Sequence, residues 1–222
     1  MDMLKAAIFD MDGVIVNSEP LHHQAYHAMF DEVGIAVPTS LYDSLTGKST
    51  INLCKQLKSH FDLALPAEEM VTIKRQHYDV IFESDKDFDL IKGVRNLIQN
   101  YYDNGLTLVL ASSSSMPSIE RVFQRFDLNQ YFKGKISGAD LVASKPHPEI
   151  FIKAAQMAGF SAQECLVIED ATSGIEAAKA AGIFCVAFDS EHTKSQDYSK
   201  ADRLINDFES IQFEAIRKDF EA

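Results

Sequence analysis

The sequence predicts an α/β fold: a doubly wound parallel sheet, Rossmann-like, with a small all-helical domain inserted after the first strand. Short apolar runs without polar alternation, such as Ala6–Phe9 and Cys165–Ile168, are typical of strands buried on both faces. Segments of helical length separate the later runs, which favours a parallel sheet. We therefore expect an α/β core over 1–16 and 85–222, and a helical domain over 17–84.

The first part of the chain carries helix signals after its one strand. Ser18 is placed to cap a helix that has Pro20 in its first turn and ends at Gly34. Two more helical stretches, near Thr50–His60 and Pro66–Glu83, follow without a strand between them. This absence of strands is what predicts the inserted domain.

From Gly93 onward, strands and helices alternate. The expected strands are 106–111, 135–137, 165–168 and 184–188, and the expected helices are 94–103, 117–126, 148–158 and an alanine-rich one from about 173 to Gly182.

Composition excludes several classes of partner. The formal net charge of −12 argues against sequence-independent nucleic-acid binding, which needs a basic surface. No apolar run is long enough to cross a membrane, and no signal peptide precedes Asp10, so we expect no membrane partner. The three cysteines, Cys54, Cys165 and Cys185, form no C-x-x-C pair, which favours a reducing cytoplasm.

Acidic pairs follow two of the predicted strands. Asp10 and Asp12 come after the first, with Gly13 allowing a sharp turn, and Glu169 and Asp170 come after another. Ligands of parallel sheets gather at the carboxyl ends of the strands. One such pair could simply cap a helix, but two pairs at one edge would repel unless a cation offsets them. Oxygen ligands suit Mg²⁺, the cofactor we predict.

A serine and a lysine belong to the same edge. Ser112 ends the strand at 106–111, and Lys145 lies in a loop with two prolines. Ser112 could instead be an ordinary serine at the start of a helix, and Lys145 an ordinary surface lysine. The sequence also does not decide whether Ser112, Ser113 or Ser114 would contact phosphate. With a carboxylate nucleophile at Asp10, these groups could stabilise a transferring phosphoryl group.

Together these residues resemble the haloacid dehalogenase superfamily, and within it the beta-phosphoglucomutase-like proteins and small phosphatases. Asp10-Met11-Asp12-Gly13-Val14 matches the first motif of the family and Leu110-Ala111-Ser112 the second. Ser144-Lys145-Pro146 and Glu169-Asp170 match the third and fourth. The resemblance covers essentially the whole chain, and the order and spacing of the motifs carry it.

The resemblance implies roles for these positions. Asp10 would be nucleophile and Mg²⁺ ligand, and Asp12 the general acid and base that also lends its carbonyl oxygen to the metal. Asp170 would ligate Mg²⁺, with Glu169 as a ligand or beside one. Ser112, with Ser113 as a further candidate, would bind phosphate, and Lys145 would bridge phosphate and nucleophile. The helical domain would be a cap that selects the substrate.

The cap residues leave phosphatase and phosphomutase open. Ser18 and His22 stand where the mutase-like proteins carry a hydroxyl and a histidine. A mutase also needs cations for its second phosphate, but Thr46 and Thr50 occupy the expected positions and Lys48 is the only nearby cation. Phosphatase therefore leads.

The predicted function is Mg²⁺-dependent hydrolysis of a small phosphate ester, with a sugar phosphate favoured, through an aspartyl-phosphate. The alternatives are a beta-phosphoglucomutase-like phosphomutase and a non-catalytic phospho-accepting signalling module, which Asp12 disfavours. We expect a monomer or weak homo-oligomer. Two other motifs are set aside. Gly47-Lys48-Ser49 lacks the first glycine of a P-loop, and the pair His23 and His27 lacks an evident third metal ligand, so a solvated or packed face is the better interpretation.

Overall fold

The computed structural model describes residues 3–45, 49–190 and 195–221, and the chain divides into two compact units. Residues 1–17 and 89–222 form an α/β unit, and residues 18–88 form a helical unit, nearly the stretch predicted as an insertion. In the described ranges no helix combines the length and apolar character that crossing a bilayer requires.

The α/β unit is built on six parallel strands in the order β3-β2-β1-β4-β5-β6, which confirms the predicted fold class. Strand β1 is central, and Ile8 lies between Val109 of β2 and Val167 of β4. All four residues of β1 are buried, as its unbroken apolar run predicts. The strands are β1 Ala6–Phe9, β2 Thr107–Ser112, β3 Phe132–Ser137, β4 Cys165–Glu169, β5 Phe184–Phe188 and β6 Arg203–Ile205.

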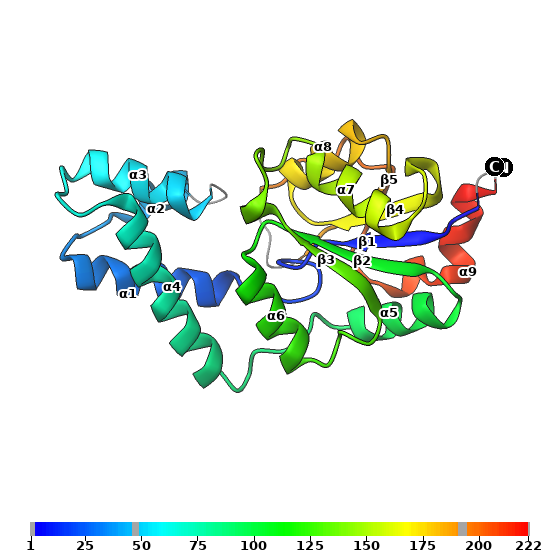
Figure 1. The fold of residues 1–222 in the computed structure, drawn as a ribbon, viewed down its shortest axis with the longest axis horizontal. Helices are drawn as coiled ribbons and strands as arrows, with labels where there is room; N and C mark the ends of the chain where they lie inside the picture. Colours follow the sequence, from blue (N-terminus) through cyan, green and yellow to red (C-terminus); the bar gives the residue numbers. More distant parts are fainter. Residues whose placement is uncertain (1–2, 46–48, 191–194, 222) are drawn as a thin grey trace. The chain divides into compact units, whose positions relative to one another are not determined.

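Helices cover both faces of this sheet (Figure 1). On one face, the alanines of α7 and α8 and the side chain of Phe151 pack against alternate strand residues such as Ile8 and Val109. On the other face, the ring of Phe9 packs on Tyr101 of α5 and on Phe132. The helices of this unit are α5 Val94–Asp103, α6 Met116–Arg125, α7 Glu149–Ala158, α8 Thr172–Ala180 and α9 Phe213–Ile216.

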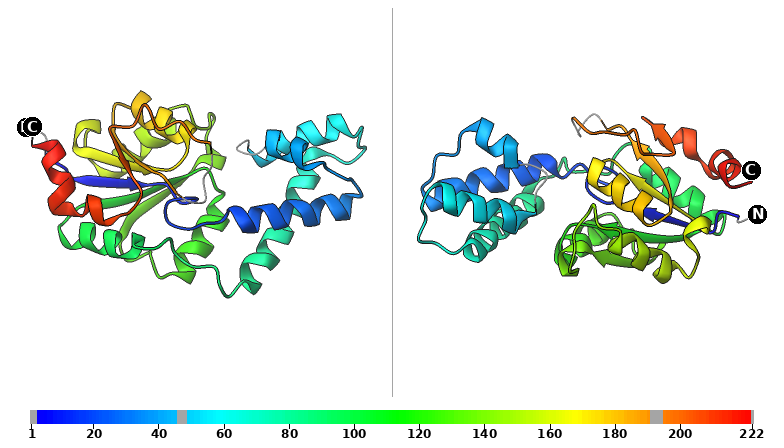
Figure 2. Two further views of the ribbon diagram at one scale, coloured as in Figure 1. Left: turned by 180° about the vertical axis from the view of Figure 1, so that it is seen from behind. Right: turned by 90° about the horizontal axis from the view of Figure 1, so that it is seen from above.

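The C-terminal segment was not assigned from the sequence. The Tyr101 hydroxyl donates a hydrogen bond to the Ile211 carbonyl over 2.7 Å, and the Asn100 side chain accepts one from the Phe213 N–H. These bonds hold α9 beside α5, as Figure 2 shows. Strand β6 was not predicted either, because three residues are too few to show a strand pattern. It is defined by its pairing with β5.

The helical unit has a core of its own. In its described residues, four helices surround a cluster that includes Met29, Leu53, Leu57 and Met70, all buried. The predicted end of the first helix is confirmed, because Gly34 takes a left-handed conformation (φ 75°) after Val33. The helices are α1 Glu19–Val33, α2 Thr39–Leu45, α3 Thr50–His60 and α4 Ala67–Ser84; the short α2 was not predicted.

The three cysteines lie buried in the two cores, and none of them forms a disulfide in the described structure. A cytoplasmic location stays a prediction.

Candidate active site

The chain makes a tight turn directly after β1. Asp10 is buried, and its N–H donates to the Ile168 carbonyl of β4 over 3.0 Å. The Met11 carbonyl then accepts hydrogen bonds from the N–H groups of Ile15 (2.8 Å) and Val16 (3.0 Å). Gly13 has φ 89°, a conformation that glycine adopts without strain. The turn therefore leaves Asp10 at the carboxyl edge of the sheet, as predicted for the ligand-binding edge of parallel strands.

Two glycines make room for the carboxylates at the end of β4, those of Glu169 and Asp170. A Cβ on Gly13 would lie 1.9 Å from the Asp170 Oδ2 atom, and one on Gly174 would lie 1.7 Å from the Glu169 Oε1 atom. Such approaches are impossible for any side chain, so Gly13 is required for space as well as for its φ angle. The Asp170 carboxylate thus packs against the loop that carries Asp10 and Asp12, although about 160 residues separate them.

Lys145 links two of the buried carboxylates. Its Nζ atom lies 2.5 Å from Asp10 Oδ1 and 2.6 Å from Glu169 Oε1, and it also donates to the Ala111 carbonyl over 3.3 Å. All three charged side chains are almost completely buried. A single ammonium group therefore balances carboxylates from β1 and β4 in a place that water screens poorly.

The charge at this edge is nonetheless unbalanced toward the negative. Burial raises the pKa of Asp10 well above its usual value; Lys145 opposes the shift, and the charges of Glu169, Asp170 and Asp12 add to it. Burial disfavours the charged form of Lys145, but Asp10 and Glu169 outweigh that effect and raise its pKa. More negative than positive charge surrounds Asp10, so a further cation at this edge would be electrostatically favourable.

The donor set fits Mg²⁺. The groups at hand are carboxylate and carbonyl oxygens, which this ion prefers, with Asp10 and Asp170 as the carboxylates that would hold it. In the described part of the chain, no three or more histidine, cysteine or acidic side chains form a closed cage. Mg²⁺ does not need one, because it commonly takes one or two carboxylates and completes its shell with substrate phosphate and water.

Asp12 contacts two serines at the end of β2, Ser112 in the strand and Ser114 just after it. Ser114 Oγ donates to Asp12 Oδ2 over 2.7 Å, while Ser112 Oγ lies at 3.4 Å from the same oxygen. The Ser112 hydroxyl also accepts from the Ser114 N–H over 3.0 Å. Ser112 is fully buried and Ser113 is exposed. Sequence reasoning left Ser114 as one choice among neighbours, because the direction of each hydroxyl depends on how the turn folds.

The helical unit holds the other predicted residues. Ser18 is buried at the N-cap of α1, and its carbonyl accepts from the His22 N–H. The His22 ring stacks on Tyr78, and its Nδ1 atom lies 2.7 Å from Nζ of Lys74, a buried lysine that sequence reasoning missed. The one signal for Lys74 is its position on α4, the helix that packs against His22, and that packing is not readable from the sequence. Lys48, the third residue predicted here, lies outside the described residues.

Comparison with known proteins decides the family. A family profile described as haloacid dehalogenase-like hydrolase matches residues 7–188, which is most of the chain. The chain belongs to the haloacid dehalogenase-like hydrolase family. The predicted resemblance, and with it the prediction of an enzyme, are confirmed.

Relatives of this hydrolase span nearly the same length. A beta-phosphoglucomutase of Bacillus subtilis is 26% identical, covering 98% of this chain and 96% of its own. A phosphorylated carbohydrates phosphatase of Thermotoga maritima is 28% identical over 81% of this chain and 82% of its own. The crystal structure of a beta-phosphoglucomutase from Clostridium difficile, 26% identical, superposes with a TM-score of 0.82 over 99% of this chain and 98% of that one. The relatives thus include both a phosphatase and a mutase.

Proposed function

We propose that this protein is a Mg²⁺-dependent phosphatase that hydrolyses a small phosphorylated metabolite, with a sugar phosphate as the favoured class. The observation that carries the proposal is the position of Asp10: its carboxylate is buried at the carboxyl edge of the sheet, fixed by Lys145 at 2.5 Å and flanked by Asp12 and Asp170. A carboxylate held in this way can act as a nucleophile toward phosphorus.

The first step forms an aspartyl-phosphate. An oxygen of Asp10 attacks phosphorus, the bond from phosphorus to the ester oxygen breaks, and that oxygen takes a proton from the Asp12 carboxyl group. In the second step the Asp12 carboxylate takes a proton from water, whose oxygen attacks phosphorus and releases inorganic phosphate from Asp10. Asp12 ends protonated, ready for the next cycle.

Fixed donors meet the charge of the phosphoryl group. The Lys145 ammonium and the hydroxyl and N–H groups of the turn at Ser112–Ser114 lie at the same edge as Asp10. When bound by Asp10 and Asp170, Mg²⁺ supplies positive charge to the phosphoryl oxygens. Ser114 Oγ, which bonds Asp12, would hold this carboxyl group in position for proton transfer. We therefore add Ser114 to the predicted site.

The helical unit is proposed as a cap that selects the substrate. It has its own hydrophobic core, so its surface residues can vary without disturbing the catalytic sheet. The metabolite is the one partner this proposal requires.

A phosphomutase is the second candidate, and the contact between Lys74 and His22 favours it. A buried lysine beside a histidine offers a cationic and hydrogen-bonding group to an anionic or hydroxylated ligand. Thr50, one of the positions where a mutase would need a cation, instead accepts a hydrogen bond from the Tyr26 hydroxyl. Hydrolysis to water therefore remains the leading proposal.

The test is a panel of sugar phosphates and other small phosphate esters, with Mg²⁺, followed by phosphate release and by product analysis. Free phosphate from at least one ester, abolished by EDTA, supports the phosphatase. An isomerised ester that needs a bisphosphate primer indicates the mutase. A long-lived phosphoprotein without turnover indicates a signalling module and contradicts both enzymes.

Asp12→Ala separates the acid and base steps from nucleophilic attack. Both steps should slow by roughly 10²–10⁴-fold, the usual contribution of general acid–base catalysis. Asp103→Ala, which makes the same change at an exposed aspartate of α5, serves as the matched control. Near-normal turnover in Asp12→Ala would refute its role.

A further inference from the structure

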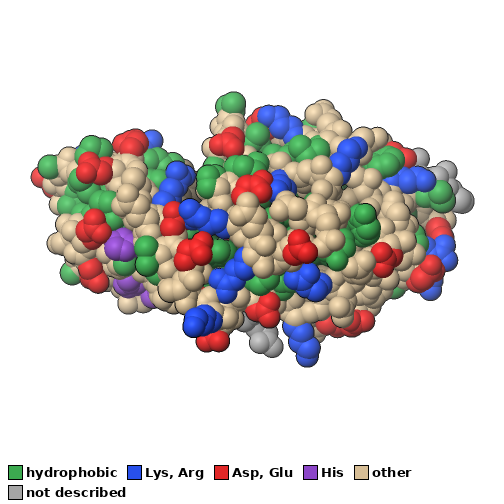
Figure 3. Space-filling model, turned by 60° about the horizontal axis from the view of Figure 1, so that its bottom comes forward, with side chains coloured by type: hydrophobic (Ala, Val, Ile, Leu, Met, Phe, Trp, Pro, Cys, Tyr) green, Lys and Arg blue, Asp and Glu red, His purple; other side chains and the backbone are tan. Residues whose placement is uncertain are grey.

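A pair of histidines on α1 stands apart from the carboxylate site. His23 and His27 lie one helical turn apart, both exposed, with ring centroids 4.2 Å apart and ring planes inclined by 37°. Histidine side chains gather on the surface of the helical unit in Figure 3. Spacing of four residues puts both rings on one face of the helix.

Aromatic neighbours orient this pair. The Tyr42 ring meets His23 nearly edge-on (5.3 Å, 88°) and His27 at 5.6 Å, while Phe30 packs against His27 at 5.4 Å. Both Tyr42 and Phe30 are buried in the core of the unit. The imidazoles are thus supported from the protein side and open on the other, so less side-chain freedom is lost when they bind a ligand.

The nitrogen atoms of the pair are available. Within the described residues, neither His23 nor His27 makes a hydrogen bond or an ion pair. By contrast, the Nε2 atom of His77 on α4 lies 2.7 Å from a carboxylate oxygen of Glu32. Glu19 and Asp31 lie one turn before and one turn after the pair on the same helix, and both are exposed. Two open imidazoles with carboxylates near them are a ligand set for a borderline divalent ion.

We propose that His23 and His27 together bind one borderline divalent metal ion, such as Zn²⁺, Ni²⁺ or Cu²⁺. Metal–nitrogen bonds of about 2.0–2.1 Å allow a single ion to reach one nitrogen from each of two rings this close. Water completes the shell, in keeping with the absence of a cage of three or more protein ligands in the described structure. Mg²⁺ does not compete, because it prefers oxygen.

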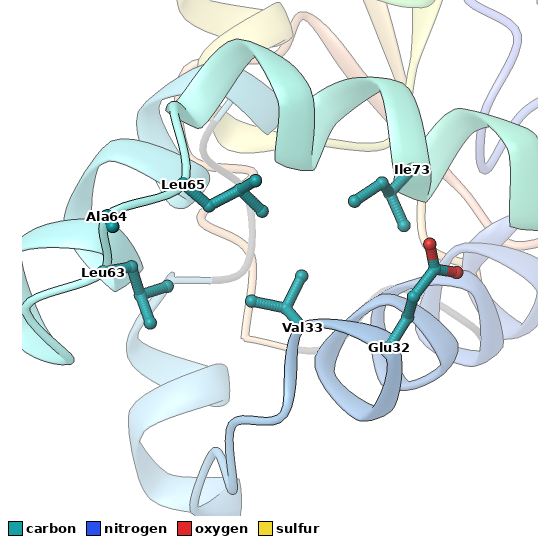
Figure 4. Close-up of a pocket in the computed structure, with 6 residues that line it drawn as sticks. All are labelled: Glu32, Val33, Leu63, Ala64, Leu65 and Ile73. Carbon is teal, nitrogen blue, oxygen red and sulfur yellow. The ribbon is translucent and has the colours of Figure 1, made fainter.

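The site is distinct from the apolar pocket of the same unit. That pocket, of about 360 Å³, is lined by Val33, Leu63, Leu65 and Ile73, with Glu32 beside them (Figure 4). The side chains that line it offer no nitrogen or sulfur to a metal, and the Glu32 carboxylate already contacts His77.

The experiment is calorimetric titration of the untagged full chain with NiCl₂ at neutral pH, with excess Mg²⁺ present to occupy oxygen sites. The chain should take up one Ni²⁺ ion, and His23→Gln and His27→Gln should each weaken the affinity by about tenfold or more. His60→Gln, which removes another histidine of this unit, should leave it unchanged. Ni²⁺ should also raise the unfolding temperature of the original chain and of His60→Gln.

Equal Ni²⁺ binding by all four proteins, or no binding by the original chain, would overturn the proposal. Circular dichroism of each variant establishes that it is folded. Because His23 and His27 are exposed, a loss of binding with an unchanged spectrum reports the loss of a ligand. A shared loss in His60→Gln would place the ion elsewhere and would also count against the pair.

Discussion

The two units of this chain treat their chemistry-bearing side chains in opposite ways. In the α/β unit, the carboxylates of Asp10 and Glu169 are buried and share one buried lysine. In the helical unit, His23 and His27 stand on the surface, supported only from beneath. Buried anionic groups need countercharge from several distant segments, whereas side chains that stay exposed to water, such as these two histidines, do not.

Among the described residues, each unit also contains a buried lysine. Lys145 lies between carboxylates of two strands, while Lys74 contacts the His22 ring nitrogen and lies 4.9 Å from the ring centroids of Tyr26 and Tyr78. An ammonium group can be stabilised by the faces of aromatic rings as well as by opposite charge. The Lys145 Nζ atom likewise lies 5.0 Å from the Phe151 ring centroid, so both units place an aromatic ring near a buried ammonium group. At Lys145, two buried carboxylates balance the charge as well.

The largest effect is expected where the α/β unit carries its proposed chemistry. Asp10→Asn keeps the size of the side chain but removes the nucleophile, so turnover should fall by on the order of 10⁴-fold or more. Phosphate release on the best ester of the panel measures it, and Asp103→Asn, at an exposed aspartate, should retain full activity. If Asp10→Asn kept a turnover within tenfold of that of the original protein, Asp10 could not be the nucleophile.

Lys145→Met tests charge balance through stability. With the ammonium gone, two buried carboxylates face each other, and the free energy of unfolding should drop by about 3 kcal/mol. Denaturant titration gives this value. Lys179→Met removes a partly exposed partner of Asp202 and should cost at most about 1 kcal/mol. A similar loss of unfolding free energy in both variants would mean that the buried contacts of Lys145 contribute no more to stability than a partly exposed ion pair.

Leu57→Ala asks whether the helical unit is stabilised by its own core. Leu57 is completely buried in that cluster, so the cavity should lower stability by about 2–5 kcal/mol. Hydrogen exchange should accelerate in α3 and α4 and leave β1 and β2 unchanged. The control is Val80→Ala on the exposed side of α4. Faster exchange throughout the sheet would contradict two separate cores.

Asp170→Asn should have the smallest effect of the four. The carboxylate against Gly13 is proposed to hold Mg²⁺ together with Asp10, and its loss should raise the Mg²⁺ concentration for half-maximal activity by roughly 10–100-fold, as for groups that support a metal site. Asp140→Asn, at an exposed aspartate, provides the comparison. An unchanged Mg²⁺ titration would remove Asp170 from the ligand set.

Local patterns predicted most of the helices and strands. The helix at Thr50–His60 and the strand at Phe184–Phe188 have the predicted bounds, because each shows its pattern within a few residues. The sequence alone could not indicate α2 or β6, which are short and exist through tertiary packing and pairing. The strand expected at 135–137 begins at Phe132, because pairing with β2 extends it.

By itself, the sequence determined that acidic residues follow two buried strands, and parallel strands place such ends at one edge of a sheet. Folding of the whole chain was needed to show that Lys145 joins Asp10 to Glu169, that Ser114 bonds Asp12, and that Lys74 lies beside His22. The two kinds of feature differ in how far apart in the sequence their residues lie. A helix or strand is indicated by residues that are close together in the sequence. A side-chain contact between residues a hundred positions apart depends on rotamers and loop paths, which no local pattern encodes.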